Sequence, residues 1–190
     1  MRQHWAVNQN VRTTTSPDID GGDLRLRPME HSDIAAWYAY LRLPHVLEHT
    51  SWNLVSADEL RPLVDEYNSD SASSKLCFAI ESVMEPRLVG AIGFHTVSQV
   101  HRSAEIAFNL NPEYWGRGIA TRCCNAVADW GFSDQGYVRI QAAALDTNLA
   151  SMRVIEKCGF QREGKVRSFR LVRGLPRDFW VYSRIANGPA

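Results

Sequence analysis

The chain lacks an excess of charge of either sign, because 21 lysines and arginines balance 21 aspartates and glutamates over 190 residues. Without a net field, neither nucleic acid nor an anionic membrane is an expected partner. The chain also lacks a run of about 20 apolar residues that could cross a bilayer, and its first 22 residues are polar, unlike a secretory signal. These absences predict a soluble, cytoplasmic protein whose partner is a small molecule or a local protein segment.

Cysteine is scarce, and its spacing excludes two common uses. The four cysteines form neither a Cys-x-x-Cys pair nor the regular framework of a disulfide-rich domain. We expect them to be small core hydrophobes in a reducing compartment. They are Cys77, Cys123, Cys124 and Cys158.

The length and composition predict one domain. With 190 residues and 45% hydrophobic content, the chain can bury one sizeable core but is short for two. Residues 1–22 are polar, show no sustained period and end in Gly21-Gly22, which predicts a flexible arm. The folded domain is expected over residues 23–186, followed by a short tail at 187–190.

Alternating and apolar segments predict strands, and helical spacing predicts helices. Ser56 and Glu59 have the spacing of a capping box, and Gly131 is expected to end the third helix. The order indicates an α/β fold with a mixed sheet. Strands are expected at 24–27, 76–80, 88–94, 104–110 and 138–144 and on either side of 173–176, and helices at 33–41, 57–67, 118–130 and 148–159.

The most informative segment is Asn111 to Thr121, which joins a predicted strand to a predicted helix. Gly116 and Gly118 allow a sharp turn that presents backbone N–H groups, and the start of the helix adds the positive end of its dipole. This pattern favours a bound phosphate. A plain strand-to-helix turn is the alternative, and a dinucleotide fingerprint would need glycine or alanine at Thr121.

With residues 148–160, which end in Glu-Lys-Cys-Gly-Phe, this loop resembles the acetyl-CoA signature of the Gcn5-related N-acetyltransferase (GNAT) superfamily, and within it the ribosomal-protein N-terminal acetyltransferase branch. The resemblance covers about Leu24 to Ile185 and departs from the superfamily pattern at Trp115, where glutamine or arginine is usual. It implies a single-domain α/β GNAT-like fold, with a mixed, mostly antiparallel central sheet splayed at the cofactor site and flanked by helices.

The resemblance also implies acetyl-CoA as co-substrate, with no metal. The cofactor would be held by residues of the glycine loop and of the second motif. Asn148 has two compatible roles, since asparagine is a favoured N-cap and the matching family residue contacts the pantetheine arm. The expected cofactor-binding residues are Leu110, Asn111, Trp115, Gly116, Arg117, Gly118, Ile119, Ala120, Thr121, Asn148 and Ser151.

Two residues are candidates for proton transfer. Many superfamily members carry a tyrosine acid where Ile155 stands, so Ser151 is expected to protonate the leaving thiolate in its place. Glu105 is the candidate base because its strand alternation places it, with Ala107 and Asn109, opposite Ile106 and Leu110. The alternative for Glu105 is a partly exposed carboxylate with no catalytic role.

A base is needed because only a neutral amine attacks a thioester, and an α-amine with a pKa near about 8 is easier to deprotonate than a lysine near about 10.4. We expect direct transfer without an acyl-enzyme, with the oxyanion held by a backbone N–H near Asn109 to Asn111. The preferred acceptor is a protein N-terminal α-amine. A polyamine, an aminoglycoside or an amino-acid derivative is the alternative.

The acceptor wall is expected in the early aromatic region, with Trp52, Asn53 and Glu105 as first choices. Arg167, Arg170 and Asp178 are further candidates for the same cleft, and the alternative for them is a solvated hairpin. The enzyme is expected to be a monomer or homodimer. Two other classes remain open at this point. One is a CoA-binding module without catalysis, and the other is a zinc peptidase, because residues 45–49 read His-x-x-Glu-His.

Overall fold

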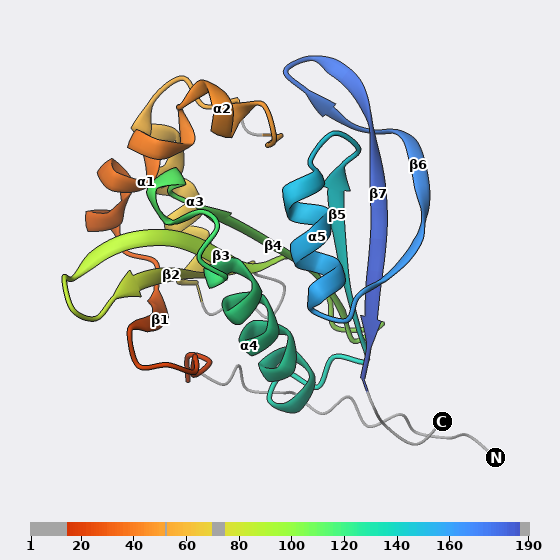
Figure 1. Ribbon diagram of the computed structural model, residues 1–190, viewed down its shortest axis with the longest axis horizontal. Coiled ribbons are helices and arrows are strands. Elements are labelled where there is room, and N and C mark those ends of the chain that lie inside the picture. The colour runs from red at the N-terminus through yellow and green to blue at the C-terminus, as the bar shows by residue number, and fades with distance from the viewer. Residues whose placement is uncertain (1–14, 52, 70–74, 187–190) are drawn as a thin grey trace.

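The structure is a computed structural model, and it describes residues 15–51, 53–69 and 75–186. Its centre is a seven-stranded sheet in the order β1-β2-β3-β4-β5-β7-β6 (Figure 1). All neighbouring strands are antiparallel except β4 and β5, which are parallel. The strands are β1 (Leu24–Pro28), β2 (Leu76–Ser82), β3 (Arg87–Ser98), β4 (Ser103–Leu110), β5 (Arg139–Leu145), β6 (Gln161–Val172) and β7 (Leu175–Ile185).

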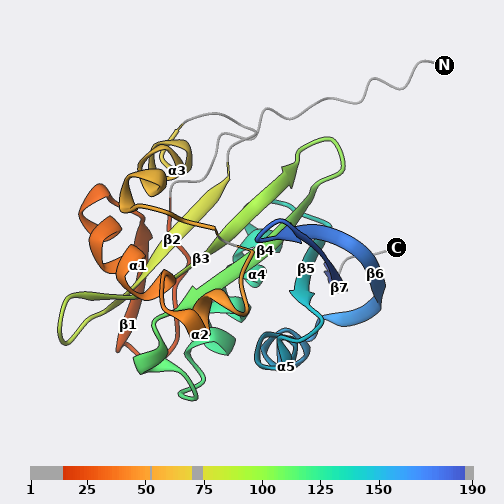
Figure 2. The same ribbon diagram turned by 90° about the horizontal axis from the view of Figure 1, so that it is seen from above.

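Helices cover both faces of the sheet, as Figure 2 shows for α1 and α3 on one side and α5 on the other. The larger core lies between the sheet and the helices α4 (Ile119–Ser133) and α5 (Leu149–Lys157), and it includes Phe94 and Ile140. A second core packs α1 (Ile34–Leu41) and α3 (Arg61–Tyr67) on the other face, around Trp37 and Leu60. The mixed, open α/β sheet expected from the sequence is therefore confirmed.

The early helices begin where local signals place them. Ser56 and Glu59 form the predicted capping box, and the Ser56 N–H donates to Glu59 Oε1 over 3.3 Å. The first turn after it, Ala57–Leu60, is a 3₁₀ turn, so α3 itself starts at Arg61. A 3₁₀ turn at His31–Asp33 likewise precedes α1. Tight i to i+3 turns are common at helix starts, and periodicity does not distinguish them from the helix.

Gly131 does not end the third predicted helix, contrary to expectation. Helix α4 continues to Ser133, and Gly131 lies inside it, fully packed against the sheet. A Cβ atom at this position would come within 2.8 Å of the Phe94 ring and 2.9 Å of Ile140 Cδ1. The glycine therefore serves close helix–sheet contact rather than helix termination.

The structure adds a helix that the sequence did not predict and describes part of the expected arm. A short helix not predicted from the pattern, α2 (Pro44–Leu47), begins at a proline. Of the expected flexible arm, residues 1–14 lie outside the described residues, as does the tail at 187–190. Residues 15–22 lie near α4, where Ile19 packs against the main core and the Arg122 guanidinium donates to Asp20 O over 3.1 Å.

The cysteines behave as packing residues. Cys123, Cys124 and Cys158 are buried in the main core, and all four cysteines are free thiols. Burial raises the pKa of Cys123 to about 12, so its thiol stays protonated and is a weak nucleophile. In the described parts of the chain, every helix is too short or too polar to cross a bilayer.

Candidate active site

Strands β4 and β5 pair over only three residues and then separate. Ser103 to Glu105 pair with Arg139 to Gln141, whereas on its other side β4 stays paired with β3 as far as Leu110. The carboxyl half of β4 thus has no strand partner toward β5. This is the predicted splay of the central sheet, and Glu105 lies on the last shared rung.

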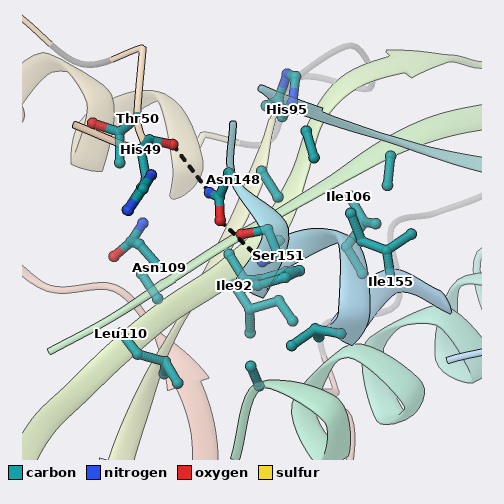
Figure 3. Close-up of a pocket in the computed structure, with 18 of the residues that line it drawn as sticks. His49, Thr50, Ile92, His95, Ile106, Asn109, Leu110, Asn148, Ser151 and Ile155 are labelled. Atoms are coloured by element: carbon teal, nitrogen blue, oxygen red, sulfur yellow. Dashed lines mark hydrogen bonds between the residues drawn. The ribbon is translucent and has the colours of Figure 1, made fainter. Parts of the chain in front are cut away.

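One pocket of about 1070 Å³ occupies this gap. It is lined at one end by Gly116 and Gly118 of the loop before α4, in the middle by Ser151 of α5, and at the other end by His95 and Arg170. Figure 3 shows the middle and the far end, with Asn148 and Ser151 of α5 facing residues of β3 and β4. The volume is slightly above the range of about 300–1,000 Å³ that is typical of small-ligand pockets.

The loop end is shaped by backbone geometry. Gly116 and Gly118 both have φ of 75°, in the left-handed region that favours glycine. Gly118 is the N-cap of α4, and no side chain caps the helix, so the N–H groups at its first turn are free to face a ligand. No atom lies within 4 Å of a Cβ built on either glycine, so the cradle is open. These features fit a diphosphate.

The aromatic side chains of Tyr114 and Trp115 hold this loop in place through contacts with neighbouring residues. The Trp115 indole donates to the Leu110 carbonyl over 3.0 Å, and its ring meets His45 edge-on. The guanidinium groups of Arg87 and Arg117 lie over the Tyr114 ring at 5.4 and 5.3 Å. Because tryptophan can make this bond to the strand end, Trp115 gives the unusual first motif position a local structural role.

The start of α5 joins two parts of the site. Asn148 Oδ1 accepts from the Ser151 N–H over 3.0 Å, which is the predicted N-cap, and its Nδ2 donates to the His49 carbonyl over 3.2 Å (Figure 3). Asn148 is only 9% exposed. Its amide therefore fastens α5 to the loop after α2, while its contact with a pantetheine arm stays a prediction. Ser151 lines the pocket, as a thiolate donor would have to.

Side chains on β4 alternate as the sequence predicted. Ile106 and Leu110 belong to the core under α4, whereas Asn109 faces α1 and accepts hydrogen bonds from the Trp37 indole and the Tyr40 hydroxyl. Asn109 is thereby fixed in orientation at the pocket wall.

Glu105 is the most heavily bonded of the predicted residues. One of its oxygens accepts from Arg170 Nη2 and lies 3.2 Å from His95 Nε2, and the other accepts from Gln141 Nε2 over 3.0 Å. It is 3% exposed. Burial by itself would raise the pKa of Glu105, but the hydrogen bond from His95 and the charge of Arg170 outweigh it and lower the pKa to about 2. The base assignment stays a prediction, and these bonds favour a carboxylate that remains charged.

The wall at this end of the pocket includes some of the residues predicted for the acceptor side, and it includes His95, which was not predicted. Asn53 is exposed and lines the pocket, Arg170 lines it from β6, and Trp52 lies outside the described residues. His95 was missed. It is the extra residue of a β-bulge, since Phe94 pairs with Ile106 and Thr96 with Glu105, so alternation along β3 does not reveal its direction.

The zinc-peptidase alternative lacks the helix that it requires. Helix α2 ends at Leu47, before His49, so His45 and His49 do not stand one turn apart on a continuous helix. Among the described residues, no group of three or more His, Cys, Asp or Glu side chains is placed to hold a metal ion.

Comparisons with known proteins agree with this geometry. A model of the acetyltransferase (GNAT) domain family matches residues 23–161. The N-acetyltransferase YoaA of Bacillus subtilis (strain 168) is 32% identical over 169 residues, which cover 88% of this chain and 96% of YoaA.

Two solved structures share the fold. One is the ribosomal-protein-S5-alanine acetyltransferase from Vibrio fischeri, with a TM-score of 0.77 and 22% identity over 91% of this chain and 97% of that one. The other is spermidine N-acetyltransferase from Vibrio cholerae in complex with CoA and spermine, with a TM-score of 0.76 and 23% identity over 87% of this chain and 96% of that one. The splayed sheet, the open glycine cradle and these matches together mean that the chain belongs to the GNAT family and is an N-acetyltransferase.

Proposed function

We propose that this enzyme transfers the acetyl group of acetyl-CoA directly to a primary amine, and that its preferred acceptor is a protein N-terminal α-amine. The observation that carries the proposal is a continuous pocket whose lining includes the glycine cradle, Ser151 and Arg170. A nucleotide thioester bound at one end would present its acyl group to an amine entering from the other. Such placement converts a bimolecular step into an effectively unimolecular one.

The diphosphate would lie on the first turn of α4, held by the backbone N–H groups of Ile119, Ala120 and Thr121 and by the loop from Gly116 to Gly118. The pantetheine arm would then follow β4 along Leu110 and Asn111 toward Asn148 and Ser151. The Arg117 guanidinium, exposed beside the cradle, adds positive charge near the phosphates.

The backbone of β4 offers a donor for the oxyanion. The Asn111 N–H is already bonded to the Val89 carbonyl over 2.9 Å, so Asn111 faces β3. Neighbouring residues on a strand face opposite sides, and the Leu110 carbonyl is bonded to Trp115 rather than to β3. The N–H of Leu110 therefore points into the gap, and we assign it the tetrahedral oxyanion.

The proton steps follow from the reaction. The amine nitrogen attacks the thioester carbon, the C–S bond breaks, and the departing thiolate takes a proton through the Ser151 hydroxyl. A thiol pKa near about 8.5 makes the thiolate a fair leaving group, so a weak donor is sufficient. The charged carboxylate of Glu105 stabilises the proton as it leaves the acceptor ammonium.

Charge at the acceptor end favours a singly charged amine over a polyamine. Among the described residues that line the pocket, Glu59 is the acidic one, and its Oε1 already accepts from the Val55 and Ser56 N–H groups. Arg170 and Lys75 line the same region and occupy the carboxylates of Glu105 and Glu66, so these carboxylates are already paired before a second ammonium group could bind. A polyamine acceptor is the second candidate, because a spermidine acetyltransferase shares the fold.

The test combines calorimetry of acetyl-CoA binding with a thiol-release assay. The acceptors are tetrapeptides with free alanine, serine or methionine termini, spermidine, and an aminoglycoside. We expect heat on mixing with acetyl-CoA, and kcat/KM at least about tenfold higher for a peptide than for spermidine. Faster turnover of spermidine would assign the second candidate, and absence of binding heat would remove acetyl-CoA from the proposal.

A further inference from the structure

Besides Glu105, a second titratable side chain, His95, lies at the end of the pocket where the acceptor is proposed to bind. Neither cofactor binding nor core packing accounts for it. His95 lines the pocket from β3, about one-third exposed, at the bulge where β3 slips by one residue against β4 (Figure 3). A bulge turns a side chain away from the direction that regular alternation would give it. Here the result is an imidazole over Glu105.

We propose that His95 is the catalytic base that takes the proton from the acceptor ammonium, and that Glu105 is a positioning residue that fixes the ring. The inference rests on the proposed function. It reassigns the proton-accepting atom from the buried carboxylate of Glu105 to the pocket-lining imidazole in front of it.

The bonds around the ring determine its tautomer. Glu105 Oε1 lies 3.2 Å from His95 Nε2, and a carboxylate can only accept, so Nε2 carries the hydrogen. The other nitrogen, Nδ1, then has a free lone pair, and the Thr96 hydroxyl donates to it over 3.0 Å. Thr96 is exposed and also lines the pocket, so this partner is one that an entering amine or water can displace or work through.

Glu105 is itself held in place for this role. Arg170 and Gln141 bind its two oxygens, so the carboxylate cannot turn toward the pocket without breaking bonds to β5 and β6. The pKa of about 2 keeps the carboxylate charged at neutral pH, where it supports the cation that forms on the ring. A base held by a third group is the arrangement that acid–base sites commonly use.

Several charged groups face His95 from neighbouring strands. Glu105 comes from β4 and Arg170 from β6, and Lys75, which precedes β2, extends the register that pairs Leu76 with Phe94. The Lys75 ammonium is bound to Glu66 over 3.0 Å. Of these charged groups, the Glu105 carboxylate is the one in direct contact with the ring.

The proton balance is complete with these residues. The ammonium passes one proton through intervening water to His95 Nδ1 and becomes a nucleophile, because His95 lies opposite Glu105, five residues along β4 from Leu110. His95 later releases that proton to solvent. The nitrogen of the tetrahedral intermediate loses its second proton while the thiolate gains one through Ser151. The products are the acetylated amine, free CoA and one proton in solution.

The test compares His95→Gln and Glu105→Gln with the wild type, using an alanine tetrapeptide and spermidine as acceptors. For whichever acceptor the wild type turns over, His95→Gln should lower kcat/KM by about 10²-fold or more near pH 7. The rate of this variant should recover as the pH rises, because the fraction of acceptor present as the neutral amine increases. Acetyl-CoA affinity should be unchanged, and the circular dichroism spectrum should show that the variant is folded. Glu105→Gln should have the smaller effect on rate.

His101→Gln is the matched control, because His101 is exposed in the turn between β3 and β4 and should leave all these values unaltered. Nitrogen-15 spectra of the His95 ring give a second measurement that needs no acceptor. We expect the Nε2–H tautomer in the wild type and a loss of that preference in Glu105→Gln.

The proposal would be overturned by an Nδ1–H tautomer in the wild type, or by a His95→Gln variant with the wild-type rate and pH profile. Failure of the wild type to acetylate either amine would instead contradict the proposed acceptor class, and the spectra would still decide the state of the His95 ring.

Discussion

The pocket end proposed to bind acetyl-CoA is built mainly from backbone, whereas the end proposed to bind the acceptor is built from side chains. At the first, Gly116 and Gly118 set a left-handed turn and α4 offers uncapped N–H groups. At the second, His95 from β3 and Arg170 from β6 both bind Glu105 of β4. The difference teaches that a shared co-substrate can be bound by local chain geometry, while acceptor chemistry depends on contacts distant in sequence.

The largest expected effect is at the cofactor end. Gly118→Asp places a carboxylate where the diphosphate would bind and forces a non-glycine residue to φ of 75°. We expect acetyl-CoA affinity to fall by at least about 10²-fold, measured by calorimetry. Gly22→Asp is the control, since Gly22 has φ of 68° and open space around it but lies outside the cradle. Unchanged affinity in Gly118→Asp would contradict the backbone-built phosphate site.

At the acceptor end, Glu105 should produce a dependence of stability on acid pH. Its pKa is lowered from 4.5 to about 2 in the folded protein, so between these values the unfolded chain binds more protons. The stabilisation is therefore complete above about pH 4.5 and is lost as the pH falls through 2.

Acid unfolding followed by circular dichroism measures this effect. Between pH 5 and pH 2, the free energy of unfolding of the wild type should fall by on the order of 2 kcal/mol more than that of Glu105→Gln. Glu85→Gln, at an exposed position in the β2–β3 turn, should follow the wild type. Parallel curves for the wild type and Glu105→Gln would mean that the carboxylate is not held by His95 and Arg170.

Ser151 lies between the two ends, and its hydroxyl should matter for the chemical step alone. Ser151→Ala should lower kcat by about tenfold, because water can replace a weak acid for a leaving group of this pKa. The acetyl-CoA dissociation constant should stay within about twofold. Stopped-flow thiol release separates the chemical step from product release, and a full wild-type rate in that step would move the proton donor elsewhere.

Asn148 offers the smallest and most specific test. Asn148→Asp keeps the oxygen that caps the Ser151 N–H but removes the donor to the His49 carbonyl, whereas Asn148→Ala removes both. Thermal unfolding should show a loss of about 1 kcal/mol for Asn148→Ala and less for Asn148→Asp. If the tether positions the acceptor loop, both variants should raise the acceptor KM equally. A raised KM in Asn148→Ala alone would assign the effect to the cap.

The same contrast explains what the sequence could predict. The glycine loop, the Ser56–Glu59 capping box and the Asn148 N-cap each act within a few residues, so their spacing predicted the open turn before α4 and the local caps. Glu105 was placed on the correct face of β4 by alternation. Its partners could not be predicted, because His95 is turned by a bulge and Arg170 arrives from a strand 65 residues later.

Gly131 and His49 illustrate the same limit. Gly131 was read as a helix end because local rules favour glycine there, whereas the structure uses it for contact with Phe94. His49 seemed to belong to a metal motif by spacing alone, yet its carbonyl is what the site uses, as the acceptor for Asn148. In both cases the role of the residue depends on a contact with a residue distant in sequence, and the local spacing of residues does not predict that contact.

The amide of Asn148 connects the helix beside the proposed thioester site to the loop beside the proposed amine site. Binding of acetyl-CoA at the cofactor end would therefore restrict the motion of the acceptor loop before the amine binds. Kinetically, this favours a compulsory sequence in which the acyl donor loads first and the deacylated carrier leaves last. Product-inhibition patterns, with free CoA competitive against acetyl-CoA and noncompetitive against the amine, would be the signature of that order.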